Sequence, residues 1–308
     1  MSLHSRVFAL ALLVFVGTTG CSMKKIAIRS TGEIIKDGME AFYDEEDLEL
    51  ARAAAPSNLK LIEGLVRGDP KNKDLLLVAA SAFGGYAFGF LEMDMELFHN
   101  QDDDKYEDTK RRAKLLYQRS LEYSLRILRD DFPEFDKLMQ EGSADDMKAY
   151  VSKAGQRHIG GLFWTAFAWG NIVNLSRDDM GQIAQLPKVK VVMEKVAEID
   201  ETYFNGGPHL FFAILNTGIP KGLGGNPEKG KEHFEKAFEI NNGKLLLANV
   251  FFARFYAVAV QDKKLYEEQL DKVLNAPDDI MPGQNLYTAI AKARAKVLKE
   301  RVEDFILE

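Results

Sequence analysis

The chain has 308 residues, of which 46% are hydrophobic and 28% are charged, and its formal net charge at pH 7 is −7. This composition is ordinary for a globular protein and excludes a disordered or low-complexity chain. The acidic charge balance lacks the basic footprint of a nucleic-acid-binding protein, so we expect no nucleic-acid partner. The single cysteine excludes an intrachain disulfide, and packing must therefore stabilise the fold.

The N-terminal segment has the organisation of a secretory leader. Arg6 supplies a positive charge, and the run from Val7 to Val16 is apolar. An apolar run of this length is too short to span a bilayer and is typical of a signal peptide. We therefore predict a signal peptide over residues 1–20.

The only cysteine, Cys21, stands directly after this leader, in the position of a lipoprotein cysteine. The preceding residues resemble a lipobox, although Thr18 stands where Leu or Val is more usual. We predict lipidation of Cys21, because several acyl chains anchor a protein stably at about 0.8 kcal/mol per buried methylene. Residues 21–30 would then form a tether, and Ser22 is compatible with sorting to the outer membrane. The alternative is an ordinary secretory leader with a chance cysteine.

The rest of the chain carries helical periodicity, with apolar residues spaced by three and four positions. We predict a single all-α domain over residues 31–308. A proline inside a helix removes a backbone hydrogen bond, so Pro56 is expected to separate two helices. The predicted helices cover residues 31–43, 45–56, 57–67, 75–98, 105–130, 143–154, 158–178, 187–200, 208–218, 227–241, 244–260, 262–275 and 285–306.

The segment from Leu75 to Phe98 is the most hydrophobic part of the mature chain. Its uncharged run is at the length threshold of a membrane span, which is the alternative interpretation. Because acidic residues follow at once, we favour a central helix buried in the protein. Gly84, Gly85 and Gly89 would then mark places where another helix approaches closely.

A weak internal repeat indicates the architecture. Residues 194–199 (EKVAEI) recur as residues 235–240 (EKAFEI), and a fainter copy lies at residues 270–274. Helix pairs repeated every 34–45 residues or so are typical of tetratricopeptide-like (TPR-like) and HEAT-like arrays. Since the copies are irregular, we predict a degenerate α-solenoid of TPR-like helix pairs rather than a regular one.

The helix expected over residues 158–178 combines aromatic and amide side chains on one face, namely Trp164, Phe167, Asn171 and Asn174. Trp169 falls on a different side. An apolar core face carries amides only when they are hydrogen-bonded. The face is therefore either a set of satisfied polar groups against neighbouring loops or a surface that contacts a ligand or partner.

Two further places combine polar and aromatic residues. His209, Phe212 and Asn216 share one face of their predicted helix, as a ligand wall or around a structural histidine. In the apolar helix over residues 244–260, the strongly polar side chains are Asn249 and Arg254. A buried guanidinium is costly unless paired, so Arg254 either forms an ion pair with a neighbouring helix or binds an anionic ligand.

No arrangement of residues indicates catalysis. The stretch Gly225–Lys231 matches part of a phosphate-binding loop, but no strand precedes it and Glu232 replaces the Ser or Thr that binds magnesium. The five histidines show no metal-binding spacing. We expect no metal, no cofactor and no enzymatic activity.

The chain resembles one family over most of its mature length, the T-component lipoproteins of TRAP transporters (TatT). The resemblance lies in the order and spacing of segments at Glu46–Glu63, Asp69–Pro70, Trp164–Asn174, Leu186–Pro187, Gly206–His209, Gly224–Glu228 and Ala253–Tyr256. It implies an all-helical, TPR-like lipoprotein that forms a homotrimer. It also implies a partner, the periplasmic substrate-binding (P) component of a tripartite ATP-independent transporter.

With this resemblance, the sequence favours a lipid-anchored periplasmic scaffold that docks the P component and binds or relays a small ligand, apolar with an acidic end. The candidate ligand-binding residues are Trp164, Phe167, Asn171, Asn174, His209, Phe212, Asn216, Asn249, Arg254 and Tyr256. The alternative is a TPR-like adaptor lipoprotein that binds protein segments during envelope assembly, since helical arrays present grooves for peptides.

Overall fold

The computed structural model describes residues 34–35, 38–219 and 221–307, and all regular structure within these ranges is helical. The all-α prediction is therefore confirmed for the described part of the chain. The predicted signal peptide, the lipidation site Cys21 and the tether over residues 21–30 lie outside it. Of the helix predicted over 31–43, residues 34–35 and 38–43 are described and are helical.

The principal helices follow one another with short connections. Their bounds are α2 (Leu48–Gly68), α3 (Lys73–Tyr86), the π-helical η1 (Ala87–Leu91), α4 (Glu92–Phe98), α5 (Asp103–Leu128), α6 (Phe135–Glu141), α7 (Ala144–Val151), α8 (Ile159–Asn174), α9 (Met180–Ile183), α10 (Leu186–Ile199), α11 (Tyr203–Gly218), α12 (Pro227–Ile240), α13 (Leu246–Phe251), the π-helical η4 (Phe252–Ala257), α14 (Lys263–Leu274) and α15 (Asn285–Lys299). Short 3₁₀ turns lie between helices at Gln156–His158 and Lys221–Leu223, and another follows α15 at Val302–Asp304.

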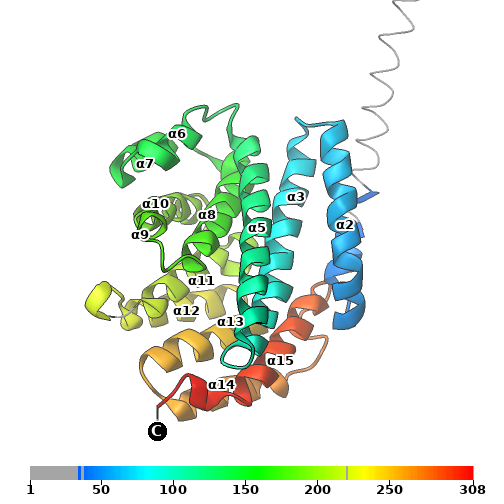
Figure 1. Cartoon of the computed structure of the whole chain (residues 1–308), viewed down its shortest axis with the longest axis vertical. Coiled ribbons are helices and arrows are strands. Elements are labelled where there is room, and N and C mark those ends of the chain that lie inside the picture. Colours follow the sequence, from blue (N-terminus) through cyan, green and yellow to red (C-terminus); the bar gives the residue numbers. More distant parts are fainter. Residues whose placement is uncertain (1–33, 36–37, 220, 308) are drawn as a thin grey trace, which may run out of the picture.

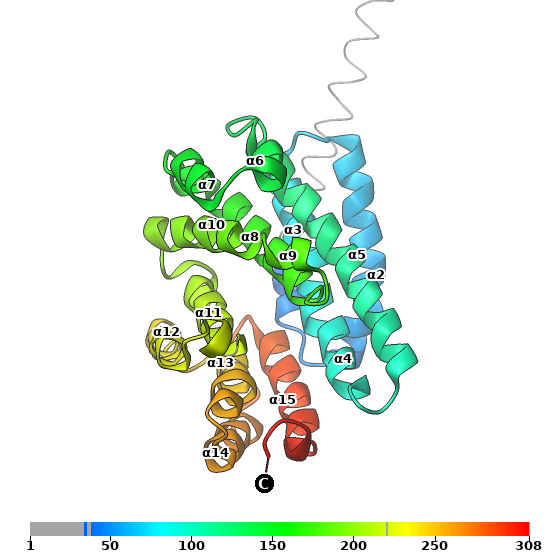
Figure 2. The same cartoon turned by 60° about the vertical axis from the view of Figure 1, so that its left-hand side comes forward.

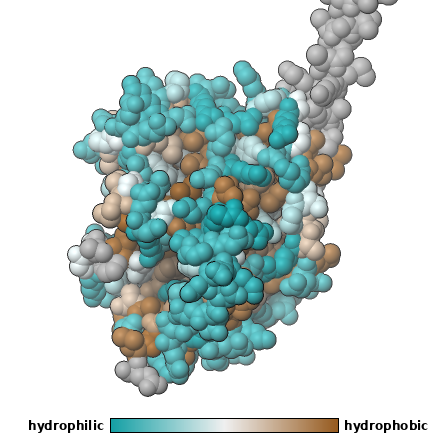
Figure 3. Space-filling view, viewed as in Figure 1, coloured by the Kyte–Doolittle hydropathy of each residue, from teal (hydrophilic) through white to brown (hydrophobic). Residues whose placement is uncertain are grey.

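Consecutive helices pack against one another, as TPR-like pairs do. Helices α2, α3 and α5 run side by side, α8 packs against α5, and α10 packs against α8. Helices α11 to α15 form the lower part of the molecule (Figures 1 and 2). The two copies of the sequence repeat are the last turns of α10 and α12. The face seen in Figure 3 is mainly hydrophilic, with hydrophobic residues visible near its centre.

The last helix returns to the first part of the chain. Helix α15 contacts α2 and α4 (Figure 1). The side-chain amide of Asn285, at the start of α15, donates a 2.8 Å hydrogen bond to Asp44. Arg294, further along α15, pairs with Glu96 of α4. The array of helix pairs therefore closes on itself instead of ending as an open solenoid.

The expected break at Pro56 is wrong, because α2 is one helix with Pro56 inside it. Its inward positions are Ala51, Ala55, Leu59, Ile62 and Val66, all buried. Burial of such a stripe contributes on the order of several kcal/mol and offsets the roughly 3 kcal/mol that an interior proline costs. The helix also begins at Leu48 rather than at Glu45, with the Asp47 side chain as its N-cap.

The hydrophobic segment Lys73–Phe98 is long and apolar enough to cross a membrane, but 56% of its apolar 18-residue stretch is buried within the protein. It consists of α3, η1 and α4, and α3 packs against α2, α5 and α8. A Cβ atom at Gly84 would lie 2.9 Å from Ser120 Oγ, and one at Gly89 would lie 3.1 Å from Ile290. These two glycines therefore mark close approaches. Gly85 does not, because a Cβ atom there would meet nothing within 4 Å.

Side chains cap two of the helices at their starts. Ser143 forms a capping box with Asp146 at the start of α7, and Asn226 is the N-cap of α12. On α5, the carboxylate of Asp108 pairs with Arg111, and that of Glu122 pairs with Arg129, which lies beyond the last turn of the helix.

Candidate functional site

The helices enclose a cavity of about 820 Å³. Its wall is built from the N-terminal helical residues, α2, α3, η1, α8, α9, α10, α11, α13 and α15, so that parts of the chain far apart in sequence meet around it. Pockets that bind small organic molecules have volumes of about 300–1,000 Å³ and mostly apolar walls with a few polar groups. The cavity has both properties.

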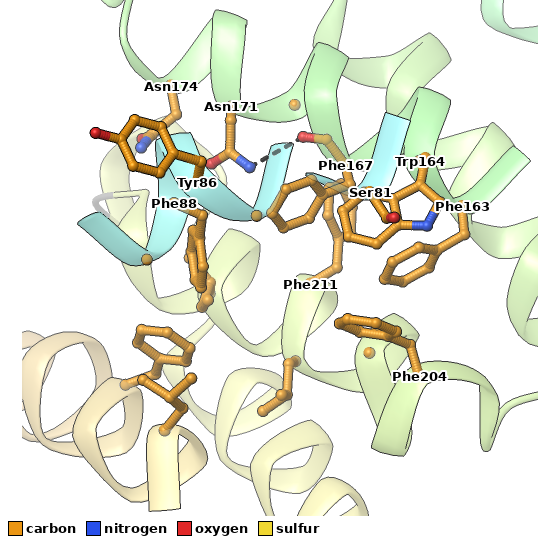
Figure 4. Close-up of a pocket in the computed structure, with 18 of the residues that line it drawn as sticks. Ser81, Tyr86, Phe88, Phe163, Trp164, Phe167, Asn171, Asn174, Phe204 and Phe211 are labelled. Atoms are coloured by element: carbon orange, nitrogen blue, oxygen red, sulfur yellow. Dashed lines mark hydrogen bonds between the residues drawn. The ribbon is translucent and has the colours of Figure 1, made fainter. Parts of the chain in front are cut away.

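Aromatic rings form much of the wall (Figure 4). Phe163, Trp164 and Phe167 come from α8, and Phe88 comes from η1. The Phe88 ring lies 5.5 Å from the rings of both Phe167 and Phe251. These separations lie within the range of favourable edge-to-face aromatic contacts, so the rings support one another and leave their free faces toward the cavity.

Four of the predicted site residues lie together on this wall, namely Trp164, Phe167, Asn171 and Asn174. The side-chain amide of Asn171 donates a 3.0 Å hydrogen bond to the carbonyl of Phe167, within the same helix (Figure 4). Trp169 points to the other side of α8 and packs in the core, as expected. The aromatic and amide face of α8 therefore fits both interpretations. Its amides form local hydrogen bonds, as satisfied polar groups would, and it also borders the cavity, as a ligand-contacting surface would.

One end of the cavity lies at the C-terminal end of α8. Here Asn174 accepts a 3.0 Å hydrogen bond from Nε of Arg177. Arg177 is exposed and lines the cavity together with the apolar residues Met180, Ile183 and Ile219. This end of the cavity therefore places a cation beside apolar side chains.

The other end carries uncharged polar groups. Tyr43 and Tyr287 lie with their ring centroids 5.6 Å apart, and the hydroxyl of Ser81, which also lines the cavity, donates a 3.0 Å hydrogen bond to the carbonyl of Val78. Burial raises the pKa of Tyr287 well above its usual value. In Figure 4, Ser81 and Phe204 lie on the side of the cavity away from Asn174. The two ends of the cavity thus differ in charge.

The start of α11 has a strained backbone, because three residues just after Tyr203 are not helical. Phe204, Asn205 and Gly206 have φ values of 52°, 59° and 82°, in the left-handed region that glycine adopts easily and phenylalanine rarely. Such residues cost on the order of 1–3 kcal/mol each and need surrounding contacts to persist. The Phe204 ring lies 5.3 Å from those of Phe163 and Trp164, and Asn205 donates a 3.0 Å hydrogen bond to Gln284. The strain places Phe204 and Asn205 in the cavity wall.

The predicted face of α11 lies elsewhere. His209, Phe212 and Asn216 do not line the cavity and are directed toward α12. Nδ1 of His209 lies 3.0 Å from Nδ1 of His233, and its Nε2 lies 3.2 Å from Glu201. Burial, followed by the nearby His209, lowers the pKa of His233.

The three candidates of the C-terminal region also lie outside the cavity wall. The amide of Asn249 donates a 2.8 Å hydrogen bond to Gln269, and Tyr256 packs on a neighbouring ring of η4. The Arg254 guanidinium lies 4.0 Å from the centre of the Phe305 ring, and burial lowers its pKa. No carboxylate in the described part of the chain forms an ion pair with Arg254. The expected ion pair with a neighbouring helix is therefore not found there.

The buried arginine that does have a carboxylate partner is Arg294. It pairs with Glu96, and its guanidinium lies 5.5 Å from the Phe88 ring and 5.2 Å from the Phe251 ring. Beside it, the Tyr117 hydroxyl donates a 2.5 Å hydrogen bond to Glu92. Burial raises the pKa of Glu92 to about 7. This polar cluster supports the aromatic wall from behind.

The sequence reasoning missed the cavity face of α11. That face consists of Gly207, Leu210, Phe211, Ile214, Leu215 and Gly218. Its spacing is a clear helical stripe, but the same stripe would be expected of a helix packed in a solid core. Among the described residues, no group of three or more histidine, cysteine, aspartate or glutamate side chains could hold a metal ion.

Comparisons with known proteins place this chain in a family. A sequence profile described as TRAP transporter T-component matches residues 44–306. The chain is also 21% identical over 317 residues to an uncharacterized protein of Treponema pallidum (strain Nichols), covering 98% of each chain. The profile match spans almost all of the helical structure that surrounds the cavity. The protein therefore belongs to the TRAP transporter T-component family.

Proposed function

We propose that this accessory component of a TRAP transporter is anchored to a membrane through Cys21, docks the substrate-binding P component and binds or relays a small ligand in its central cavity. The ligand is mainly apolar with an anionic end. The observation that carries the proposal is the cavity itself, with its volume of about 820 Å³ and its aromatic wall.

The physical reason is the transfer of apolar surface out of water. Burying a methylene group is favourable by about 0.8 kcal/mol, and an aromatic wall adds specific edge and face contacts. Protein interiors are otherwise close-packed, with few voids larger than a water molecule. A cavity of this size, backed by the buried Arg294–Glu96 ion pair and bordered by the strained start of α11, is a feature that packing alone does not require.

The binding test uses the mature chain with Cys21→Ser and diphenylhexatriene, an uncharged apolar probe that fluoresces when it leaves water. We expect saturable binding near one probe per chain. Gly85→Leu directs a side chain into the cavity from α3 and should abolish the binding. Gly64→Leu is the matched control, because Gly64 is an exposed glycine of α2 outside the cavity wall, with nothing within 4 Å of its Cβ position.

Docking is tested by sedimentation velocity of the same protein with the P component of its transporter at micromolar concentration. The proposal expects a faster boundary that contains both proteins. The trimer, a further part of the proposal, predicts a sedimenting species of three chains for the protein alone. Separate boundaries for the two proteins, together with capture of extended peptides from a membrane extract, would instead favour the adaptor alternative.

A further inference from the structure

One charged side chain lines the described wall of the cavity, and it is Arg177. It follows the last turn of α8, at the end where Asn171 and Asn174 also lie. No ion pair joins Arg177 to any carboxylate of the described residues. A guanidinium presents five N–H donors, and the recorded hydrogen bonds of Arg177 use only Nε and Nη2, both directed to Asn174. The remaining donors are open to an incoming group.

The local geometry holds this guanidinium in place at the exposed end of the cavity. Asn174 accepts from Nε at 3.0 Å, which fixes the plane of the group. Helix α11 passes close by at Gly218, where a Cβ atom would lie 3.8 Å from Nη2. The carboxylate of Asp179, two residues beyond Arg177, is occupied as the N-cap of α9, where it accepts from the backbone of Gly181 at 2.8 Å. The Asp179 carboxylate is therefore engaged by the backbone of α9 rather than by the cation.

A second cation, Arg254, lies behind the wall rather than lining the cavity, and it stacks on Phe305. It forms no ion pair with a described carboxylate, but it lies within electrostatic range of the Glu96 carboxylate as well as of Arg177. An anion at this end would therefore be bound by Arg177, in a partly desolvated place where charge interactions are stronger than in water.

The opposite end offers no comparable group. The polar atoms there belong to Tyr43, Ser81, Asn205 and Tyr287, and these side chains are uncharged. A second anionic group buried at that end would lose its hydration without gaining a cation. The cavity as a whole therefore matches a molecule with one anionic head and an apolar body.

We propose that Arg177 is the head-group residue of the cavity, and that the ligand is an amphiphile with a single anionic head and one apolar chain. The head lies at the exposed Arg177 end, where it keeps part of its hydration, and the chain extends along Phe167 and Trp164 toward Phe204. The inference rests on the proposed function, since it requires that the cavity binds a ligand.

The experiment displaces bound diphenylhexatriene from the Cys21→Ser protein at pH 8, with all competitors below their critical micelle concentrations. Dodecanoate, dodecanol and dodecanedioate have the same chain length and differ in the number of charged ends, which is one, none and two. We expect dodecanoate to displace the probe at a concentration about tenfold or more below that of dodecanol, because a hydrogen bond to a charged group is stronger than one between neutral groups. Dodecanedioate should be weaker than dodecanoate.

The variant Arg177→Gln should remove the preference of dodecanoate over dodecanol and leave dodecanol unchanged. Arg112→Gln, at an exposed arginine of α5 outside the cavity, should keep the preference. Equal displacement by dodecanoate and dodecanol in the parent protein would overturn the head-group assignment. Failure of diphenylhexatriene to bind at all would instead overturn the proposed function.

Discussion

The guanidinium of Arg294 and the carboxylate of Glu96 form a buried, two-bonded ion pair that joins the last long helix to α4. The Arg294 side chain is 3% exposed and that of Glu96 is 14% exposed. The Nε atom donates at 3.0 Å to Oε2, and Nη2 donates to Oε1. Arg301 adds a 2.5 Å hydrogen bond to the Glu96 carbonyl. These contacts close the ring of helices around the cavity.

Removing one partner of this pair should destabilise the fold strongly. Arg294→Met leaves the Glu96 carboxylate buried without its cation, which typically costs about 3–5 kcal/mol. Urea denaturation measures the loss. The double variant Arg294→Met with Glu96→Met should recover much of it, because apolar replacement of a whole buried pair is often nearly neutral. A single variant as stable as the parent would show that the pair does not hold the ring closed.

A matched surface pair provides the control. Lys264 and Glu268 also form an ion pair, but their side chains are 87% and 58% exposed. Exposed pairs contribute about 0–1 kcal/mol. Lys264→Met should therefore change the free energy of unfolding by less than about 1 kcal/mol.

Glu92 should make the stability of the protein depend on pH. Burial raises its folded-state pKa to about 7 from an ordinary value of 4.5. Between these values the folded state binds more protons than the unfolded state, so the stability that Glu92 contributes is full below pH 4.5. It is lost as pH rises through 7, by up to about 3 kcal/mol.

The variant Glu92→Gln tests this pH dependence, because glutamine keeps an acceptor for the Tyr117 hydroxyl but does not titrate. The parent protein should lose stability relative to the variant between about pH 4.5 and 7, and the difference should level off above that range. Chemical denaturation across pH 4.5–8 measures both proteins. Parallel curves would mean that Glu92 titrates in the folded state as it does in water.

Two adjacent glycines of α3 should respond oppositely to the same substitution. A Cβ atom at Gly85 meets nothing within 4 Å, so Gly85→Ala should stabilise the helix by about 1 kcal/mol. A Cβ atom at Gly84 would lie 2.9 Å from Ser120 Oγ and 3.3 Å from Trp164, so Gly84→Ala should destabilise by about 1–3 kcal/mol. Thermal denaturation of the two variants gives the sign directly, and equal shifts would contradict the packing described.

Pro56 is exposed on the outer side of α2. Pro56→Ala restores a backbone N–H inside the helix without removing a core contact. The variant should be more stable by about 2 kcal/mol, since an interior proline costs about 3 kcal/mol and proline returns up to about 1 kcal/mol by restricting the unfolded chain. Urea denaturation tests the gain, and a loss of stability would show that the α2 backbone is shaped to the proline.

Much of the fold could be predicted from the sequence, because helical periodicity and capping residues act locally. The N-caps Ser143 and Asn226 and the buried stripe of α10 are examples. The break at Pro56 was wrong because tertiary burial of the whole inner face of α2 outweighs a local penalty. The closure of the ring could not be predicted either, since it depends on a pair between Glu96 and Arg294 that no periodicity connects.

The candidate site was predictable only where polar and apolar residues share a face. On α8, amides among aromatics indicated an unusual surface, and that face lies on the cavity wall. On α11 the residues that line the cavity are apolar, and an apolar stripe has the same pattern whether it borders a core or a void. Arg177 was missed because a single arginine after a helix is ordinary in sequence, and its meaning comes from the cavity beside it.

The central claim, that a ligand occupies the cavity beside α8, is tested most directly by contact quenching of tryptophan. The chain has two tryptophans, and Trp164 lines the cavity whereas Trp169 does not. Dibromostearate, whose bromines quench only over short distances, should strongly quench Trp164 in the Trp169→Phe variant and quench Trp169 in the Trp164→Phe variant much less. The quenching should disappear when Gly85→Leu is added. Equal quenching of the two tryptophans, or quenching that Gly85→Leu leaves intact, would contradict the account.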